Sequence, residues 1–283
     1  MLALIAGLTA ACAWAVHDML VRKIGQETAI LPMMLVVLAA GSVALLGPAL
    51  IWGDWGQMTG AALANVVAAG FAYVLGMGGL YRAFSLAPVR LVAPILGAFP
   101  MISLGFAALG GKAVTGMEVA AVLAIVGGIA IVALTSDEGH ETVGRPGVAM
   151  LWSAAGSVGF ATTFWFAQEA ARLGGEWPAI LLPRLIALGL IGGGALMARA
   201  PLTQLGGSGR TLAMMGVLDA FAIGLVTAAA SLPNPEYAAI SASLFGVLTI
   251  LLAWRVLKER VAPLQWSGIV TVFVGIAVLS FQG

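Results

Sequence analysis

A long stretch of this chain occurs twice, and the repeat limits the fold more than any other feature. A shift of 147 positions places residues 86–134 on residues 233–281 without a gap. In each copy an apolar run of about 20 residues is followed by a short charged break and a second apolar run. Pro88 falls on Pro235, and Gly128 falls on Gly275. An internal repeat in so apolar a chain is typical of transporters built from two halves.

The composition is that of a membrane protein. Hydrophobic residues make up 61% of the chain and charged residues only 9%, with a mean hydropathy of +1.06. A soluble domain carries roughly a quarter charged residues. The net charge of +1 offers no basic field to nucleic acid, so no such partner is expected. One cysteine and two histidines are too few for a disulfide or a cysteine- or histidine-based metal site, and we predict no metal or cofactor.

Ten apolar runs predict an all-α, polytopic membrane protein with ten transmembrane helices. A helix needs about 20 mostly apolar residues to cross a bilayer. The first run lacks the basic n-region of a signal peptide, so it is interpreted as a retained span. The predicted spans are residues 2–21, 30–52, 60–84, 86–109, 115–135, 146–170, 177–199, 209–231, 236–256 and 263–281.

The longest polar segment divides these spans into two groups of five. Residues 136–145 are expected to link a first domain, 1–135, to a second, 146–283. Because five is an odd number, the two halves must enter the membrane in opposite directions. The sequence therefore predicts two inverted five-helix repeats.

The basic residues predict the orientation. Ten of the thirteen Lys and Arg residues flank the breaks after spans one, three, five, seven and nine. Only Lys112 and Arg172 flank the other breaks, and Arg184 lies inside a span. Loops rich in Lys and Arg stay in the cytoplasm, so this count places both termini outside.

Residues 238–279 contain the runs AAISAS and LFGVLTILLAW, then Glu259 five residues after the second run, and Gly268 and Gly275. In these features the segment resembles the EamA domain of the drug/metabolite transporter superfamily. In the first half, LAPVRLVAPILGAFP, Glu118 and Gly128 fit the same pattern.

This resemblance implies a ten-span, multi-pass protein of the cell inner membrane that exports small organic metabolites such as amino acids. A small-molecule substrate and the lipid bilayer are then its partners, and a homodimer is left open. Two features depart from the family pattern. Lys112 stands where the family tends to have Glu, and the family usually keeps its termini in the cytoplasm.

Two charged residues lie deep inside apolar spans. Asp219 is about 12 Å into its span and Arg184 about 10 Å into its span from the opposite side, at 1.5 Å per residue. A charge at such depth costs at least about 2.5–3.5 kcal/mol. We expect the two to form an ion pair, either in a substrate or proton pathway or as a purely structural link.

Seven further residues are candidates for the pathway or its wall. His17 and Asp18 lie near the end of span one, where a transport role competes with an interfacial cluster involving Arg22. Arg90 and Tyr237 occupy equivalent places in the two copies and could instead anchor their spans at the interface. The deeper aromatic residues, which suit a cavity wall or ordinary packing, are Trp14, Tyr73 and Trp165. Glu259 is predicted to pair with Arg255, four residues before it.

These observations favour a secondary transporter that works by alternating access between two inverted repeats. The sequence contains no ATP-binding motif, so a gradient, exchange or facilitation must drive transport. The alternative within the same superfamily is a flippase for a lipid-linked carrier, which basic residues such as Arg82 and Arg90 would serve. An intramembrane enzyme or sensor is a third alternative. No catalytic constellation is recognisable, and we predict that the protein is not an enzyme.

Overall fold

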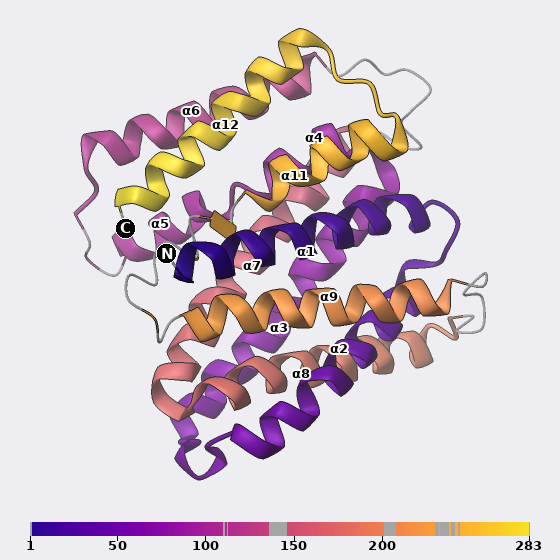
Figure 1. Ribbon diagram of the computed structural model, residues 1–283, viewed down its shortest axis with the longest axis vertical. Helices are drawn as coiled ribbons and strands as arrows, with labels where there is room; N and C mark the ends of the chain where they lie inside the picture. Colours follow the sequence, from indigo (N-terminus) through magenta and orange to yellow (C-terminus); the bar gives the residue numbers. More distant parts are fainter. Residues whose placement is uncertain are drawn as a thin grey trace.

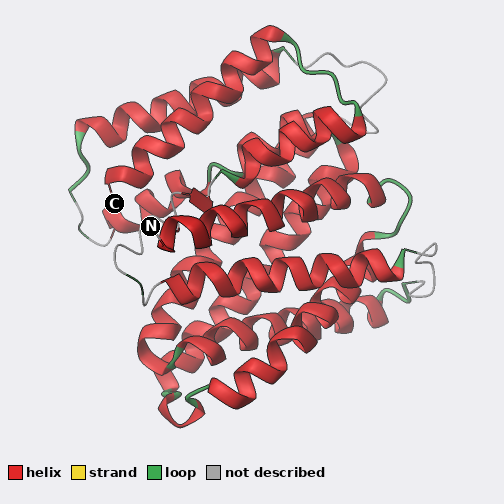
Figure 2. Ribbon diagram, viewed as in Figure 1, coloured by secondary structure: helices red, strands yellow, loops and turns green. Residues whose placement is uncertain are grey.

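The protein is all-α, as predicted. A computed structural model describes residues 2–109, 111, 113–135, 146–200, 208–229, 232, 238, 241–242 and 244–282. The described residues form helices joined by turns and short loops, and they include no strand (Figure 2). The predicted linker at 136–145 and Tyr237 lie outside the described residues.

The helices follow the apolar runs of the sequence closely. Predicted span 30–52 has the bounds of α2, and span 60–84 ends two residues before α3 does. The helices are α1 Leu2–Ile24, α2 Ile30–Trp52, the short η1 Trp55–Gln57, α3 Gly60–Leu86, α4 Val89–Leu96, α5 Phe99–Leu109, α6 Gly116–Leu134, α7 Pro146–Gly174, α8 Glu176–Met197, α9 Gly209–Ala228, α11 Phe245–Leu252, the π-helix η3 Ala253–Leu257 and α12 Pro263–Gln282.

The fourth predicted span is divided in two. Helix α4 contains Pro94, which has no backbone N–H to continue the ladder, and it ends at Leu96. Helix α5 begins at Phe99 after the short break at Gly97 and Ala98. The break places Phe99 at the start of a helix, as Phe245 is at the start of α11.

Six segments of the described chain are long and apolar enough to cross a membrane, judged by length and composition. They are residues 30–52, 60–86, 89–106, 146–174, 176–197 and 209–226, and three shorter apolar helices cover 116–132, 245–257 and 263–278. The chain is therefore a multi-pass membrane protein, while the count of ten spans stays a prediction.

Helices from the two halves of the sequence alternate in space. In Figure 1 most helices run across the view, with α6 and α12 at the top and α2 and α8 at the bottom. Helix α3 packs against α7, α1 packs against α9 and α11, and α2 packs against both α8 and α9. The largest buried apolar cluster includes residues of both halves, from Val21 to Ile276. The two halves therefore share one core.

Helices α6 and α12 begin with the same hydrogen bond. The backbone N–H of Thr115 donates to Glu118 at 2.7 Å, and that of Ala262 donates to Gln265 at 3.0 Å. At α6 the Thr115 hydroxyl also accepts from the N–H of Glu118, which completes a capping box. The paired positions 115 and 262, and 118 and 265, are each 147 apart.

The contact between α6 and α12 is reciprocal. A Cβ on Gly128 would lie 2.6 Å from the carbonyl oxygen of Gly268, and one on Gly275 would lie 2.8 Å from that of Ala121. Adding 147 to 128 and 121 gives 275 and 268, so each contact is the image of the other. Contacts also exchange partners in this way at interfaces between subunits related by a two-fold axis.

Candidate functional site

A cavity of about 60 Å³ lies between helices α1, α3, α7 and α9, and the first residues of α5 and α11 close part of it. The lining is mainly aromatic and aliphatic, with a few polar side chains. Small-molecule sites in proteins have this composition.

Asp219 is held by three side chains from three different helices. The Arg184 guanidinium forms an ion pair with Asp219 at 2.5 Å, from Nη1 to Oδ2. The Tyr73 hydroxyl donates to the same Oδ2 at 2.7 Å, and the Trp14 indole N–H donates to Oδ1 at 3.0 Å. A buried carboxylate needs such compensation, because an unpaired charge in the membrane interior is expensive. The proximity predicted for Asp219 and Arg184 is thus observed.

Arg184 itself is almost completely enclosed. It is 1% exposed, its Nη1 donates to the Tyr73 hydroxyl at 2.9 Å, and its guanidinium lies 5.6 Å from the Tyr73 ring centroid. Its Nη2 lies against Gly41 of α2, where a Cβ would collide with it. Arg184 Nε and Nη2 have no hydrogen-bond partner among the described residues. Arg184 therefore stands behind Asp219 and does not itself line the cavity.

A second polar group lies on α1. His17 Nδ1 is 2.9 Å from Asp18 Oδ1, and His17 Nε2 is 3.2 Å from the Tyr81 hydroxyl. All three residues line the cavity and are buried. The predicted alternative, an interfacial cluster of Asp18 with Arg22, is wrong. Arg22 instead donates to the Glu259 carboxylate and to the backbone carbonyl of Phe84. No group of three or more His, Cys, Asp or Glu side chains suited to a metal ion occurs within the described parts of the chain.

The cavity wall is built from residues at matching positions in the two halves. Twelve of its fourteen lining residues form six pairs whose members are 146 positions apart, and Leu80 and Tyr81 are the remaining two. Three pairs join α1 to α7, two join α3 to α9, and one joins the starts of α5 and α11. The pairs are Trp14 with Phe160, His17 with Thr163, Asp18 with Phe164, Tyr73 with Asp219, Met77 with Ile223, and Phe99 with Phe245.

The structure brings most of the predicted pathway residues together. Trp14, His17, Asp18, Tyr73 and Asp219 line the cavity, and Arg184 supports them. Trp165 does not belong to the site, because it is 47% exposed and makes an edge-to-face contact with Phe106 outside it. Sequence reasoning missed the other lining residues, which are Met77, Leu80, Tyr81, Phe99, Phe160, Thr163, Phe164, Ile223 and Phe245.

Arg90 is buried at a different place, near Glu259, on whose carboxyl its charge acts. Glu259 pairs with Arg22 at 3.1 Å and accepts the backbone N–H of Val89 at 2.8 Å. Arg22 also donates to the carbonyl of Phe84 at 2.9 Å. The predicted pairing of Glu259 with Arg255 is therefore wrong, and Glu259 instead connects the second half of the chain to the ends of α1, α3 and α4.

Apolar helices that enclose a small, mostly apolar cavity with a few buried polar groups define a multi-pass membrane protein with an internal site. Residues 147–281 match the EamA-like transporter family. The second half of the chain is thus similar to an EamA-like domain, and this similarity is consistent with the drug/metabolite transporter superfamily.

The fold is also known from a solved structure. A crystal structure aligns with 99% of this chain and 96% of its own chain, with a TM-score of 0.67 and 18% sequence identity. At that identity the likeness concerns the fold alone. No curated protein shows significant sequence similarity to the chain.

Proposed function

We propose that this protein is a secondary transporter that moves a small organic metabolite across the cell inner membrane by alternating access. The observation that carries the proposal is the cavity wall, to which both halves of the chain contribute residues at matching positions. A site shared in this way can be exposed to either side when the halves rock about it. The EamA-like domain supports transport, and the family resemblance supports export.

Two independent sets of contacts support an inverted repeat. The six pairs of lining residues relate α1, α3 and α5 to α7, α9 and α11. The reciprocal glycine contacts relate α6 to α12. A two-fold rotation that exchanges the halves accounts for both sets. The architecture that we propose has ten spans in two domains, residues 1–135 and 146–283.

Transport by this mechanism needs no ATP. The sequence holds no nucleotide-binding motif, so the energy comes from a gradient, from exchange or from the substrate's own concentration difference. The lipid-carrier alternative finds no support in the described cavity. Arg82 and Arg90, which would serve a lipid phosphate, are not among its lining residues.

Uptake into proteoliposomes tests the proposal. The purified protein is reconstituted, and amino acids, nucleosides and small amines are screened for counterflow with and without a pH gradient. Counterflow of at least one compound above that of protein-free vesicles is expected. A screen in which no compound moves, with folded protein inserted in both directions, would argue against a metabolite transporter.

A further inference from the structure

One carboxylate of the cavity is not matched by an arginine or lysine of the described chain. The side chain of Asp18 is 3% exposed, and its Oδ1 interacts with His17 Nδ1. Asp18 Oδ2 has no hydrogen-bond partner among the described residues. A buried carboxylate oxygen in this position is costly, because it has lost water without gaining a donor. A ligand that brings a donor or a positive charge to Asp18 would offset that cost.

His17 does not reach the second oxygen of Asp18. His17 Nδ1 lies 2.9 Å from Asp18 Oδ1, and His17 Nε2 lies 3.2 Å from the Tyr81 hydroxyl, so both ring nitrogens already have partners. Asp219, by contrast, pairs with Arg184 and accepts from Tyr73 and Trp14. Asp18 Oδ2 is therefore the buried carboxylate oxygen of the described cavity wall that lacks a donor.

The walls beside Asp18 are aromatic. Trp14 precedes Asp18 by four residues on α1, so both side chains lie on the same face of the helix. The Trp14 ring centroid is 6.5 Å from that of Phe164 and 6.1 Å from that of Phe245. Aromatic faces attract ammonium groups and also accept an apolar body. A carboxylate flanked by such rings is therefore suited to an organic cation.

The same lining is poorly suited to a carboxylate. The described basic side chain nearest the site, Arg184, already bonds Asp219 and Tyr73 and lies behind them against Gly41. A substrate carboxylate would find no available cation on the described wall, and it would approach Asp18. The site thus distinguishes an amine from an amino acid, although the two share an ammonium group.

We propose, on the basis of the transporter function above, that this cavity binds a small organic amine in its ammonium form. The ammonium donates to Asp18, and the apolar body of the amine packs against Trp14, Phe164 and Phe245. This assignment narrows the substrate class to a cation without a carboxylate.

Three matched ligands test the assignment on the unmodified protein. Benzylamine, benzyl alcohol and phenylglycine share a benzyl body and differ in the ammonium and carboxylate groups. Calorimetric titration of the detergent-solubilised protein should show benzylamine binding at least tenfold more tightly than either of the others. Equal or tighter binding of benzyl alcohol or phenylglycine would overturn the assignment, and this comparison needs no variant.

The Asp18→Asn variant then tests whether Asp18 binds the ammonium group. It should bind benzylamine at least tenfold more weakly than the wild type, while its affinity for benzyl alcohol stays within twofold. Asp54→Asn removes an exposed carboxylate from the loop before η1 and is the matched control, with unchanged affinity for both ligands. A folded Asp18→Asn protein that keeps its benzylamine affinity would exclude Asp18 as the ammonium site.

Counterflow measurements distinguish a failure of the amine assignment from a failure of the transporter function. If benzylamine binds selectively to the wild type but no compound of the screen crosses the bilayer, the amine site stands and the transporter function fails. If phenylglycine is transported and benzylamine is not, the transporter function stands and the amine assignment fails.

Discussion

Tyr73 and Asp219 lie 146 positions apart in the sequence and are joined by a hydrogen bond of 2.7 Å across the cavity. Tyr73 comes from α3, Asp219 comes from α9, and Arg184 of α8 contacts both. The polar centre of the protein is thus made by residues from both halves of the chain. Any motion of the halves against one another must act on this group.

The ion pair between Arg184 and Asp219 should contribute strongly to stability. Removing one partner of a buried pair leaves an uncompensated charge, which typically costs about 3–5 kcal/mol. Arg184→Gln and Asp219→Asn should therefore each lower the melting temperature of the purified protein clearly. The double variant should lose less than the sum of the two.

The surface pair of Arg172 and Glu169 provides the control for this experiment. Arg172 is 76% exposed, so Arg172→Gln should leave the melting temperature nearly unchanged. If the losses in melting temperature of the Arg184→Gln and Asp219→Asn variants add up exactly in the double variant, the two residues are not a coupled pair.

Transport assays test the mechanistic role of Asp219 separately. A well-folded Asp219→Asn protein with full transport would remove Asp219 from the mechanism.

Gly41 should be intolerant of any side chain. A Cβ there would collide with Arg184 Nη2 and would lie 2.7 Å from the carbonyl oxygen of Gly216 on α9. Gly41→Ala should displace the guanidinium and lower the melting temperature. Gly47 lies on the same helix with no atom within 4 Å of its Cβ position, so Gly47→Ala should be neutral or stabilising by up to about 1 kcal/mol. Equal effects of the two changes would show that Arg184 is not held as described.

Adjacent glycines of α6 should respond in opposite ways. A Cβ on Gly128 would press into α12, whereas one on Gly127 would meet nothing within 4 Å. We expect Gly128→Ala to reduce the melting temperature and Gly127→Ala to leave it unchanged. Gly275→Ala should resemble Gly128→Ala, since its contact with Ala121 is the image of the one between Gly128 and Gly268. A harmless Gly275→Ala would contradict the reciprocal interface.

Glu259 should make stability depend on pH. Burial raises the pKa of the Glu259 carboxyl above its ordinary value, although the charge of Arg22 opposes this shift. The folded protein therefore binds this proton more tightly than the unfolded chain does. The contribution of Glu259 to the free energy of unfolding is complete below the pKa that its carboxyl has in the unfolded chain. This contribution is lost as the pH rises through the pKa that the carboxyl has in the folded protein.

Melting curves over a pH series can isolate this contribution. The difference in melting temperature between wild type and Glu259→Gln should change with pH across that window and level off on either side. Arg22→Gln removes the opposing charge, so it should extend the window to higher pH. A difference that stays constant at all pH values would exclude Glu259 as the titrating group.

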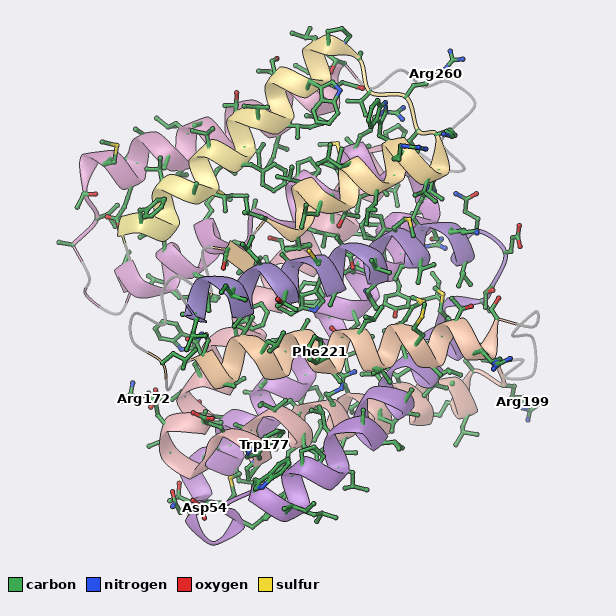
Figure 3. All side chains as sticks on the ribbon, in the orientation of Figure 1. Asp54, Arg172, Trp177, Arg199, Phe221 and Arg260 are labelled. Atoms are coloured by element: carbon green, nitrogen blue, oxygen red, sulfur yellow. The ribbon has the colours of Figure 1, made fainter. Side chains whose placement is uncertain are left out.

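The orientation of the protein can be checked with terminal reporters. Helix α1 begins and α12 ends at the same end of the molecule, at the left in Figure 1. Arg199 and Arg260 lie at the opposite end, while Arg172 lies on the side of the termini (Figure 3). The positive-inside rule then predicts that both termini face the periplasm. A phosphatase fused after residue 283 should be active and a fluorescent protein at that position dark, and the reverse result would restore the usual family orientation.

The helices were predictable because their signal is local. An apolar run such as residues 30–52 is long enough to cross a membrane and forms a helix of the same length. The positions of Asp219 and Arg184 within their own runs predicted that the two side chains lie at similar depths, and they form an ion pair. Glu259 shows where this logic fails. Its partner Arg22 is 237 positions away, whereas Arg255 is its neighbour on a regular helix, and the π-helix and the left-handed Lys258 interrupt that helix between them.

The cavity wall was harder to predict for another reason. Phe99, Phe160, Phe164 and Phe245 lie within apolar runs, where an aromatic side chain that faces a cavity looks no different from one that faces lipid. The one available signal was the weak match of Trp14-Ala15 with Phe160-Ala161, at a shift of 146. Applied to Tyr73 and Phe99, that shift leads to Asp219 and Phe245.

The gapless match of residues 86–134 at a shift of 147 is wrong at Phe99, which pairs with Phe245 at a shift of 146, and the π-helix η3 accounts for the difference. Pairs that line the cavity, up to Phe99 and Phe245, are 146 apart, whereas pairs from Thr115 and Ala262 onward are 147 apart. The second half therefore contains one extra residue between 245 and 262, and the wider turn of η3, where the N–H of Lys258 bonds the carbonyl of Ala253, lies in that interval. In the proposed inverted repeat, η3 accommodates this residue as a bulge, so the two halves tolerate a difference in length while each keeps its own contacts.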